Sequence, residues 1–401
     1  MAASFASVAV LRAPEPPDIR AFSSVEAACA CLDRDRPIPV FYPHALDTAV
    51  ATFAHAVPGE MMYAVKCNPH RSVLRALHEA GCRRFDVASI AEIDAVQSVV
   101  PGAPMAFMHP VKSRSAIRHA LAVGIDTFAL DSGDELVKIN QEVGSVSGLT
   151  LMIRLTVAGQ DAAFALTDKF GATPEEAAGL MRRAADLGAR VGLTFHVGSQ
   201  CLRPDAYKEA IALAARVTAA AGVGLDVLDV GGGFPVSYPG MTPPPMAEYG
   251  AAIADAVAAH GLTGVALFSE PGRALVAESG SMLVKVELRK GDRLYLNDGT
   301  YGALFDAGRL VRWPFPVRRV GYGGSQTLQP FSFYGPTCDS LDSMDGPFHL
   351  PQDMAEGDWI EIGHLGAYGL AMRTQFNGFG AEELVAIDPA AARPSLSIAA
   401  E

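Results

Sequence analysis

Short apolar runs alternate with longer, alanine-rich segments through the first two thirds of the chain. The apolar runs have the length and composition of buried strands, and the longer segments have the spacing of amphipathic helices. The predicted strands are Met61–Lys66, Arg84–Ala88, Met105–His109, Asp126–Asp131, Thr150–Leu155, Val191–His196, Asp226–Val230 and Ala266–Glu270. The predicted helices between them are Ser72–Ala80, Ser89–Val99, Ser113–Ala122, Gly133–Val143, Thr173–Leu187, Pro204–Ala221 and Met246–His260.

This alternation indicates parallel strands joined by crossover helices. Capping signals support the helix starts, since Ser89 is followed by Glu92 and Thr173 by Glu176. Units of this kind, eight in number, fit a closed (β/α)8 barrel, which typically takes about 250 residues. An open doubly wound sheet is the competing interpretation, but the similar strand lengths favour closure, and no dinucleotide-binding glycine fingerprint follows the first strand. We therefore predict an α/β fold with a TIM-like barrel.

The pattern changes after residue 274, where helical spacing gives way to short strand-like runs. The pairs Gly291-Asp292 and Gly357-Asp358 mark turns between them. The predicted strands are Met282–Leu288, Arg293–Leu296, Val317–Gly321, Pro330–Tyr334 and Trp359–Ile362. We predict a barrel domain over residues 38–274. An all-β domain is expected from 275–401 together with 1–37, because Pro37 and Pro39 interrupt the chain ahead of the barrel.

Composition narrows the function classes. The 401-residue chain has a formal net charge of −12 at pH 7, which argues against nucleic acid or an anionic membrane as its main partner. Its six cysteines lack metal-site spacing, so no metal is predicted, and their scatter suits a reducing, cytoplasmic location. We also expect neither a membrane span nor a signal peptide.

Chemically capable residues stand at the carboxyl ends of the predicted barrel strands. They are Lys66, Asp86, His109, Asp131, Arg154, His196, Gly231–Gly233 and Glu270. In a (β/α)8 barrel this end carries the active site. An ordinary polar surface would explain Asp131 taken alone, but it explains the whole set poorly. The sequence therefore predicts a functional site at this rim.

Two loops after the last two barrel strands suit an anion. The glycines 231–233 let backbone N–H groups approach it closely, and Glu270-Pro271-Gly272-Arg273 adds a guanidinium. This is the usual position of a phosphate in such barrels. A phosphate near Lys66 suggests pyridoxal phosphate, whose aldehyde forms a Schiff base with a lysine and whose ring nitrogen needs a carboxylate such as Glu270.

At these residues the chain resembles the fold-type III pyridoxal-phosphate decarboxylases, in their ornithine decarboxylase branch. The matching motifs are YAVKCN (63–68), FDVAS (85–89), KFGA (169–172), FHVGS (195–199), GGGFP (231–235), EPGR (270–273), NDGTYG (297–302), GPTCDSLD (335–342), GAY (366–368) and FNGF (376–379). They span nearly the whole chain. The resemblance implies an alanine racemase-like barrel with a C-terminal β domain. It also implies a homodimer in which the two chains share active sites.

The resemblance assigns roles to individual residues. Lys66 is similar to the Schiff-base lysine, His196 to the imidazole that stacks on the pyridine ring, and Glu270 to the partner of the ring nitrogen. Further cofactor contacts are expected from Asp86, Arg154, Ser199, Gly233, Gly272, Arg273 and Tyr368. Cys338 resembles the general acid that returns a proton to the α-carbon. Substrate contacts are expected from Asp306, Asp339 and Tyr301, with Cys338 and Asp339 reaching the site of the neighbouring subunit.

The stretch CDSLD at 338–342 bears on the substrate. The diaminopimelate branch carries Glu where Asp339 stands, whereas Asp suits a cationic tail. This favours L-ornithine, giving putrescine, or L-lysine, giving cadaverine. One methylene is worth only about 1–3 kcal/mol, so the sequence leaves these two open. His109, Gln200 and Met108 either line the site or pack behind it.

Two rival functions differ in class. A non-catalytic relative would bind a regulator, but such proteins usually lose cofactor ligands that this chain keeps. A racemase on the same barrel would need an opposed tyrosine base and would lack the CDSLD loop.

Overall fold

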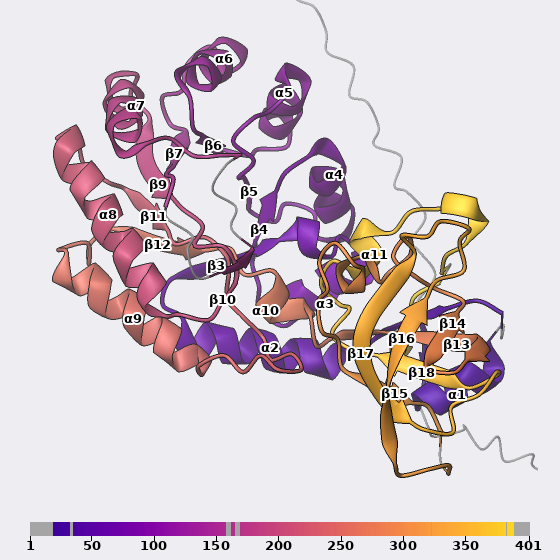
Figure 1. The fold of residues 1–401 in the computed structure, drawn as a ribbon. Helices are drawn as coiled ribbons and strands as arrows, with labels where there is room; N and C mark the ends of the chain where they lie inside the picture. The colour runs from indigo at the N-terminus through magenta and orange to yellow at the C-terminus, as the bar shows by residue number, and fades with distance from the viewer. Residues whose placement is uncertain are drawn as a thin grey trace, which may run out of the picture.

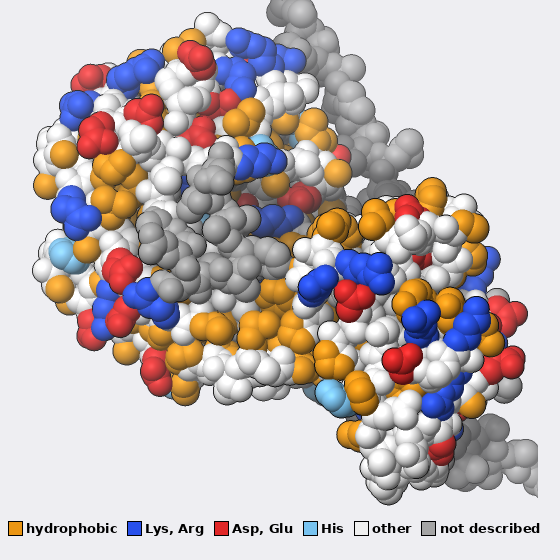
Figure 2. All heavy atoms as spheres, viewed as in Figure 1, with side chains coloured by type: hydrophobic (Ala, Val, Ile, Leu, Met, Phe, Trp, Pro, Cys, Tyr) orange, Lys and Arg blue, Asp and Glu red, His pale blue; other side chains and the backbone are white. Residues whose placement is uncertain are grey.

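The chain forms a closed barrel with a β-rich unit beside it (Figure 1). The computed structural model describes residues 19–388 except 33–34, 158–161, 165–168, 322 and 382. The predictions for residues 1–18 and 389–401 lie outside the described residues. Figure 2 shows acidic and basic side chains interspersed over the visible face of the described part.

The barrel closes through eight parallel strands in the order β11-β12-β3-β4-β5-β6-β7-β9. Their bounds are β3 (Glu60–Ala64), β4 (Arg84–Val87), β5 (Met105–Phe107), β6 (Thr127–Leu130), β7 (Thr150–Arg154), β9 (Arg190–Thr194), β11 (Val227–Asp229) and β12 (Ala266–Ser269). The predicted barrel is therefore confirmed. Most predicted strands run slightly too far, because the chain leaves the ladder where its polar rim residues begin. Lys66, for example, lies in the 3-10 turn η1 (Val65–Cys67).

Helices surround the barrel in an outer ring (Figure 1). They are α2 (Pro43–Ala56), α3 (Arg71–Glu79), α4 (Ile90–Val99), α5 (Arg114–Ala122), α6 (Gly133–Val143), α7 (Pro174–Asp186), α8 (Asp205–Ala221) and α9 (Met246–Ala259). Ser89 caps α4 and accepts a hydrogen bond from the Glu92 N–H, and Thr173 forms a full capping box with Glu176 on α7. Helix α2 was not predicted. Its apolar side chains Leu46, Val50 and Phe53 are buried.

A nine-stranded sheet makes up the second unit. Its strands are β1 (Arg20–Phe22), β2 (Ile38–Phe41), β13 (Gly280–Lys290), β14 (Arg293–Leu296), β15 (Val317–Arg319), β16 (Leu328–Tyr334), β17 (Ser343–Pro351), β18 (Trp359–Ile362) and β19 (Val385–Ile387). Short helices accompany it: α1 (Val25–Cys31), η2 (Phe305–Ala307), α11 (Gly369–Met372) and η3 (Phe376–Gly378). The sequence predicted an all-β unit, and the structure confirms a mostly β unit that also carries these short helices.

Residues 38–41 cross the domain limit suggested by the sequence. They form β2, which is antiparallel to β13 and parallel to β19 in the second sheet. Pro39 lies opposite Met282 of β13, and the pairing of β2 with β19 begins only at the next residue, Val40. Because Pro39 has no partner in β19, its missing N–H is tolerated. The chain enters the barrel unit at α2. The remaining limits of the two segments stay predictions.

The connection between the two units places the site. Helix α10 (Arg273–Val276) leads from the last barrel strand into β13, and a small antiparallel pair, β8 (Ala162–Phe164) with β10 (Ser199–Cys201), lies after the barrel strands β7 and β9. In the described residues, no helix is both long and apolar enough to cross a membrane.

Candidate active site

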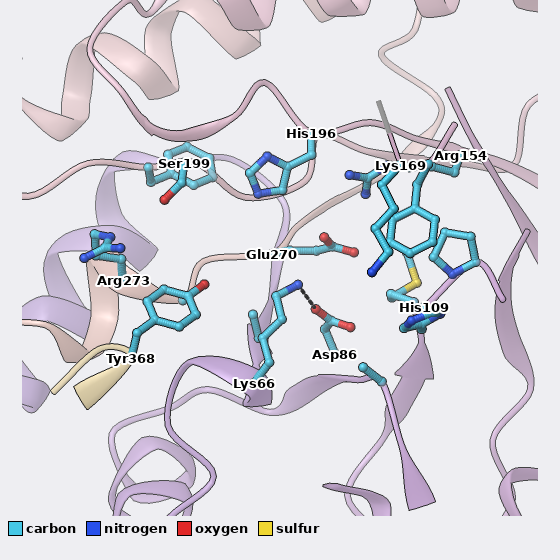
Figure 3. Close-up of a pocket in the computed structure, with 18 of the residues that line it drawn as sticks. Lys66, Asp86, His109, Arg154, Lys169, His196, Ser199, Glu270, Arg273 and Tyr368 are labelled. Carbon is cyan, nitrogen blue, oxygen red and sulfur yellow. Dashed lines mark ion pairs between the residues drawn. The ribbon is translucent and has the colours of Figure 1, made fainter. Parts of the chain in front are cut away.

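A cavity of about 480 Å³ opens at the carboxyl ends of the barrel strands. All the predicted cofactor-contacting residues line it: Lys66, Asp86, Arg154, His196, Ser199, Gly233, Glu270, Gly272, Arg273 and Tyr368. Figure 3 shows Lys66, Asp86 and Glu270 near the middle, with Ser199, Arg273 and Tyr368 at one end and Arg154, Lys169 and His109 at the other. The cavity thus brings together residues from distant parts of the chain, from Lys66 to Tyr368.

Lys66 projects into this cavity from η1 (Figure 3). Its Nζ lies 3.6 Å from Asp86 Oδ2, and its side chain is 49% exposed in the open cavity, whereas that of Asp86 is 4% exposed. The Asp86 carboxylate raises the pKa of the lysine amine. Burial raises the pKa of Asp86 to about 7, and this effect outweighs the attraction of Lys66. The amine and the carboxyl therefore form a pair at the centre of the site.

Glu270 follows β12 and is almost fully buried. Burial, with the neighbouring Asp229 carboxyl, raises its pKa to about 8. Asp229 also accepts hydrogen bonds from Thr194 Oγ1 at 2.8 Å and from the Gly231 N–H at 2.9 Å. Glu270 Oε1 has no hydrogen-bond partner among the described residues. One carboxyl oxygen is thus available to a ligand in the cavity.

His196 follows β9, and its Nδ1 accepts a hydrogen bond of 3.0 Å from the Gly198 N–H. Burial and the positive charge of Arg154 hold the pKa of the imidazole well below its usual value, so the ring is neutral. Gly232 lies directly behind the ring. A Cβ added there would lie 3.0 Å from His196 Nε2 and 2.7 Å from the Glu270 carbonyl oxygen.

The second unit of the same chain closes one end of the cavity. Tyr368 lines the cavity, and its backbone N–H donates to the Cys67 carbonyl at 2.9 Å. Asn68 Nδ2 donates to the Gly366 carbonyl at the same distance, 2.9 Å. The residues directly after Lys66 therefore hold the GAY segment against the barrel.

The cavity is also lined by residues to which the sequence assigned no definite role. His109, Gln200 and Met108 line the cavity and do not merely pack behind it. Lys169 and Phe170 line it too. Both belong to the KFGA motif, which contributed to the family resemblance but gave neither residue a role. Phe170 lies edge-on to His109, with 5.2 Å between the ring centroids.

The Gln200 side chain forms hydrogen bonds with the backbone of Val236. Its side-chain amide donates to the Val236 carbonyl and accepts from the Val236 N–H at 3.2 Å. The side chain thus links β10 to the loop after β11. Asp131, the weakest of the predicted rim residues, is not among the residues that line the cavity and accepts a hydrogen bond from the Gly171 N–H at 3.0 Å.

The predicted substrate residues and Cys338 are not among the residues that line the cavity of the single described chain. Cys338 is exposed, and Asp339 accepts a 2.6 Å hydrogen bond from the Tyr301 hydroxyl. Asp306, in η2, lies with Oδ2 3.9 Å from a terminal nitrogen of Arg273. The roles of these residues stay predictions.

The residues around the cavity fit pyridoxal phosphate. Glu270 Oε1 suits a ring nitrogen, and at the other end Arg273 Nε has no hydrogen-bond partner among the described residues. Gly233 has a φ of +100° and sits close to the Gly198 carbonyl, which leaves no room for a side chain where an anion would approach. The Lys66 amine, which points into the cavity, would suit the aldehyde. In the described part of the chain, no cluster of His, Cys, Asp and Glu has the arrangement of a metal site.

Comparison with known proteins gives the same result. Residues 44–277 match the family described as pyridoxal-dependent decarboxylase, pyridoxal binding domain. Ornithine decarboxylase of Schizosaccharomyces pombe is 34% identical over 347 residues, covering 81% of this chain and 77% of that protein. Antizyme inhibitor 2 of Xenopus laevis is 32% identical over 362 residues, covering 82% of this chain and 75% of that protein.

A solved structure is also similar over most of its length. Lysine/ornithine decarboxylase of Vibrio vulnificus, complexed with cadaverine, has a TM-score of 0.79 and 31% identity, and the match covers 91% of this chain and 97% of that one. The family match includes every barrel residue assigned to the cofactor, and the structural match extends into the second unit. The chain therefore belongs to the pyridoxal-dependent decarboxylases, and pyridoxal phosphate is its cofactor.

Proposed function

We propose that this enzyme decarboxylates a basic L-amino acid, with L-ornithine as its main substrate and putrescine and carbon dioxide as products. The observation that carries the proposal is the convergence of Lys66, Glu270 and Arg273 on one cavity, in a chain that also carries an ionised Asp339. The names of the similar proteins support it, since they include an ornithine decarboxylase and a lysine/ornithine decarboxylase.

Bound pyridoxal phosphate supplies an electron-withdrawing ring that takes up the electron pair left on the α-carbon when carbon dioxide departs. Lys66 is the amine that holds the cofactor. Burial raises the pKa of the Glu270 carboxyl. A cation facing Oε1 would lower that pKa again, so the carboxyl would be a negatively charged partner for a protonated ring nitrogen. His196 stays neutral and offers a flat face to stack on. Arg273 and the glycine loop bind the phosphate.

The proposed proton donor is Cys338, whose thiol returns a proton to the α-carbon. The proposed partner of the distal ammonium is Asp339. Its pKa is lowered by the Leu341 N–H and the Tyr301 hydroxyl, so the carboxylate is charged at neutral pH. Tyr301 therefore orients this group. Asp306 is proposed as a second carboxylate near the tail, although it also neighbours Arg273.

A homodimer is part of this proposal, because Cys338 and Asp339 need a cavity to act in. The face around them carries exposed apolar side chains: Leu310 at 82%, Leu341 at 53% and Phe376 at 44% exposure. A small apolar hollow of about 210 Å³ lies between Tyr301, Leu310 and Leu341. An apolar face of this kind suits a second copy of the chain. Each copy would then supply Cys338 and Asp339 to the other.

L-lysine is the second candidate substrate, because it differs from ornithine by one methylene. Diaminopimelate is disfavoured by Asp339, which offers a negative group to a tail that ends in a carboxylate. A regulator-binding role, as the name antizyme inhibitor 2 suggests for one similar protein, is disfavoured by the complete set of cavity residues. Six free thiols support a reducing, cytoplasmic location.

The test is carbon dioxide release from ornithine, lysine, arginine and diaminopimelate by the purified holoenzyme. We expect the highest kcat/KM for ornithine, with lysine second. Asp339→Asn should raise the KM for ornithine about a hundredfold, because the ammonium loses its charged partner. The exposed Asp205→Asn serves as a control. Preference for arginine or diaminopimelate would refute the substrate, and holoenzyme that releases no carbon dioxide would favour the regulator role.

A further inference from the structure

Arg273 is held in an unusual way at the end of the cavity. It begins α10, directly after Gly272, and its side chain is 7% exposed. The nearest carboxylate oxygen with which it forms an ion pair in the described chain, Asp306 Oδ2, is 3.9 Å away. Burial raises the pKa of Asp306. The guanidinium therefore has a distant counter-charge and must be held by other contacts.

Aromatic rings provide these contacts. The guanidinium carbon lies 4.6 Å from the ring centroid of Trp313, 5.1 Å from that of Tyr368 and 5.7 Å from that of Tyr238. One terminal nitrogen also donates to the Tyr238 hydroxyl at 2.8 Å. Ring faces attract a cation without neutralising it. Such a setting fixes the direction of the guanidinium and leaves its charge for an anion in the cavity.

Trp313 is itself rigidly placed. It is 4% exposed, and its backbone N–H donates to the Asp306 carbonyl at 2.7 Å. Its ring meets Tyr238 edge-on, with 5.2 Å between centroids and an interplanar angle of 89°. Tyr238 in turn packs against Phe315 at 5.9 Å. The residues between Asp306 and Phe315 thus form a wall of the second unit against the barrel arginine.

We propose that Trp313 is a positioning residue for phosphate binding: its ring, with that of Tyr238, orients the Arg273 guanidinium toward the phosphate of the cofactor. The inference rests on the proposed role of Arg273 in binding phosphate. It adds that Trp313, a residue of the second unit that does not line the cavity, contributes to the affinity for the phosphate. A long arginine side chain without this cage would sample many rotamers and would bind the anion less well.

The test compares two ligands that differ only in the phosphate, pyridoxal phosphate and pyridoxal. Cofactor-free full-length enzyme is titrated with each, and binding is followed by absorbance. Trp313→Leu should weaken the binding of pyridoxal phosphate about tenfold and leave that of pyridoxal unchanged. Trp313→Phe, which keeps a ring, should restore most of the affinity. Trp359→Phe, at the other tryptophan of the chain, is the matched control and should change neither constant.

The outcomes separate the inference from the function on which it rests. If Arg273→Ala selectively weakens pyridoxal phosphate while Trp313→Leu does not, the positioning role is refuted and the arginine assignment stands. If Arg273→Ala weakens neither ligand selectively, the arginine assignment itself fails. Equal loss of both ligands in Trp313→Leu would indicate general damage and also refute positioning. Should that variant not fold, Tyr238→Phe, which removes only the 2.8 Å hydrogen bond, should weaken pyridoxal phosphate alone about threefold.

Discussion

Three buried carboxyl groups distinguish this site at the level of single residues: Asp86, Asp229 and Glu270. Each has a pKa raised chiefly by burial, to about 7 for Asp86 and about 8 for Glu270. The folded protein without cofactor thus binds protons that the unfolded chain releases at much lower pH. Lys66 differs, because its pKa is raised above an already high value, so it stays charged throughout the neutral range.

These carboxyl groups predict how stability depends on pH. A raised carboxyl pKa adds stability that is fully present below the unfolded value, 4.5 for Glu270, and is lost as the pH rises through about 8. The cofactor-free enzyme should therefore unfold more easily at about pH 8 than at about pH 5, with Glu270 contributing on the order of 4 kcal/mol at most. Urea unfolding at the two pH values measures this difference.

Glu270→Gln should reduce the pH dependence, because the amide cannot ionise. Glu79→Gln, on the exposed face of α3, should leave it unchanged. Equal unfolding free energies for the wild-type enzyme at both pH values would show that the buried carboxyl groups do not retain their protons.

At the level of elements, the loop after β11 shows how tightly the site is built. Gly231 has a φ of +68°, and a Cβ at that position would collide with the Phe195 carbonyl oxygen. Gly232 does not adopt the left-handed region, so its constraint is purely steric. The loop runs close behind His196 and Glu270, the two residues proposed to contact the cofactor ring. A glycine triplet is needed here because each of its members meets a different neighbour.

Gly232→Ala should therefore damage the site while leaving the fold intact. The added methyl group would displace His196 or the Glu270 backbone, and we expect at least a tenfold weaker affinity for pyridoxal phosphate. The matched control is Gly224→Ala, where a Cβ would have no neighbour within 4 Å. Absorbance titration of both variants, with circular dichroism as the folding check, measures the effect. Unchanged cofactor affinity in Gly232→Ala would contradict the steric account.

Much of the fold was predictable because local patterns determine it. Buried strands and capped helices alternate regularly through the barrel. Strand β17 was missed because Gly346 and Pro347 interrupt its pattern, and its stability comes from pairing with β16. Strand β2 was missed because Pro37 and Pro39 resemble a break. In β17 the pairing with the preceding strand β16, and in β2 the pairing with the distant strands β13 and β19, overrides the local signal.

At the scale of the whole molecule, one chain supplies a cavity for the cofactor but leaves Cys338 and Asp339 on its surface. The cavity residues were predictable because strand ends in a barrel meet at one rim. The Trp313–Arg273 contact was not predictable, since it joins residues of different units, and ring stacking leaves no motif. The resemblance alone predicted that the exposed CDSLD loop reaches the site of a partner subunit.

The proposed shared site predicts complementation between inactive chains. Lys66→Ala and Cys338→Ala should each abolish or nearly abolish decarboxylation. When the two are mixed and allowed to exchange, half of the dimers combine one chain of each kind, and each such dimer has one intact site. About a quarter of wild-type activity should return. Carbon dioxide release from ornithine after mixing measures the recovery.

Glu270→Ala mixed with Lys66→Ala is a useful control, because both residues line the same cavity of one chain and no mixed dimer would contain an intact site. No recovery in the Lys66→Ala and Cys338→Ala mixture, despite demonstrated subunit exchange, would place both residues in one chain's site.

The hydrogen bonds that join Cys67 and Asn68 to the GAY segment also have a consequence for biosynthesis. A growing chain leaves the ribosome from its N-terminus, so the lysine turn is made roughly three hundred residues before Tyr368. After the last barrel strand has been made and before Tyr368 follows, the barrel sequence is complete but one wall of the cavity is missing. We therefore expect cofactor capture at full affinity to wait until Tyr368 has been made, so an unfinished chain should bind pyridoxal phosphate more weakly than the complete enzyme.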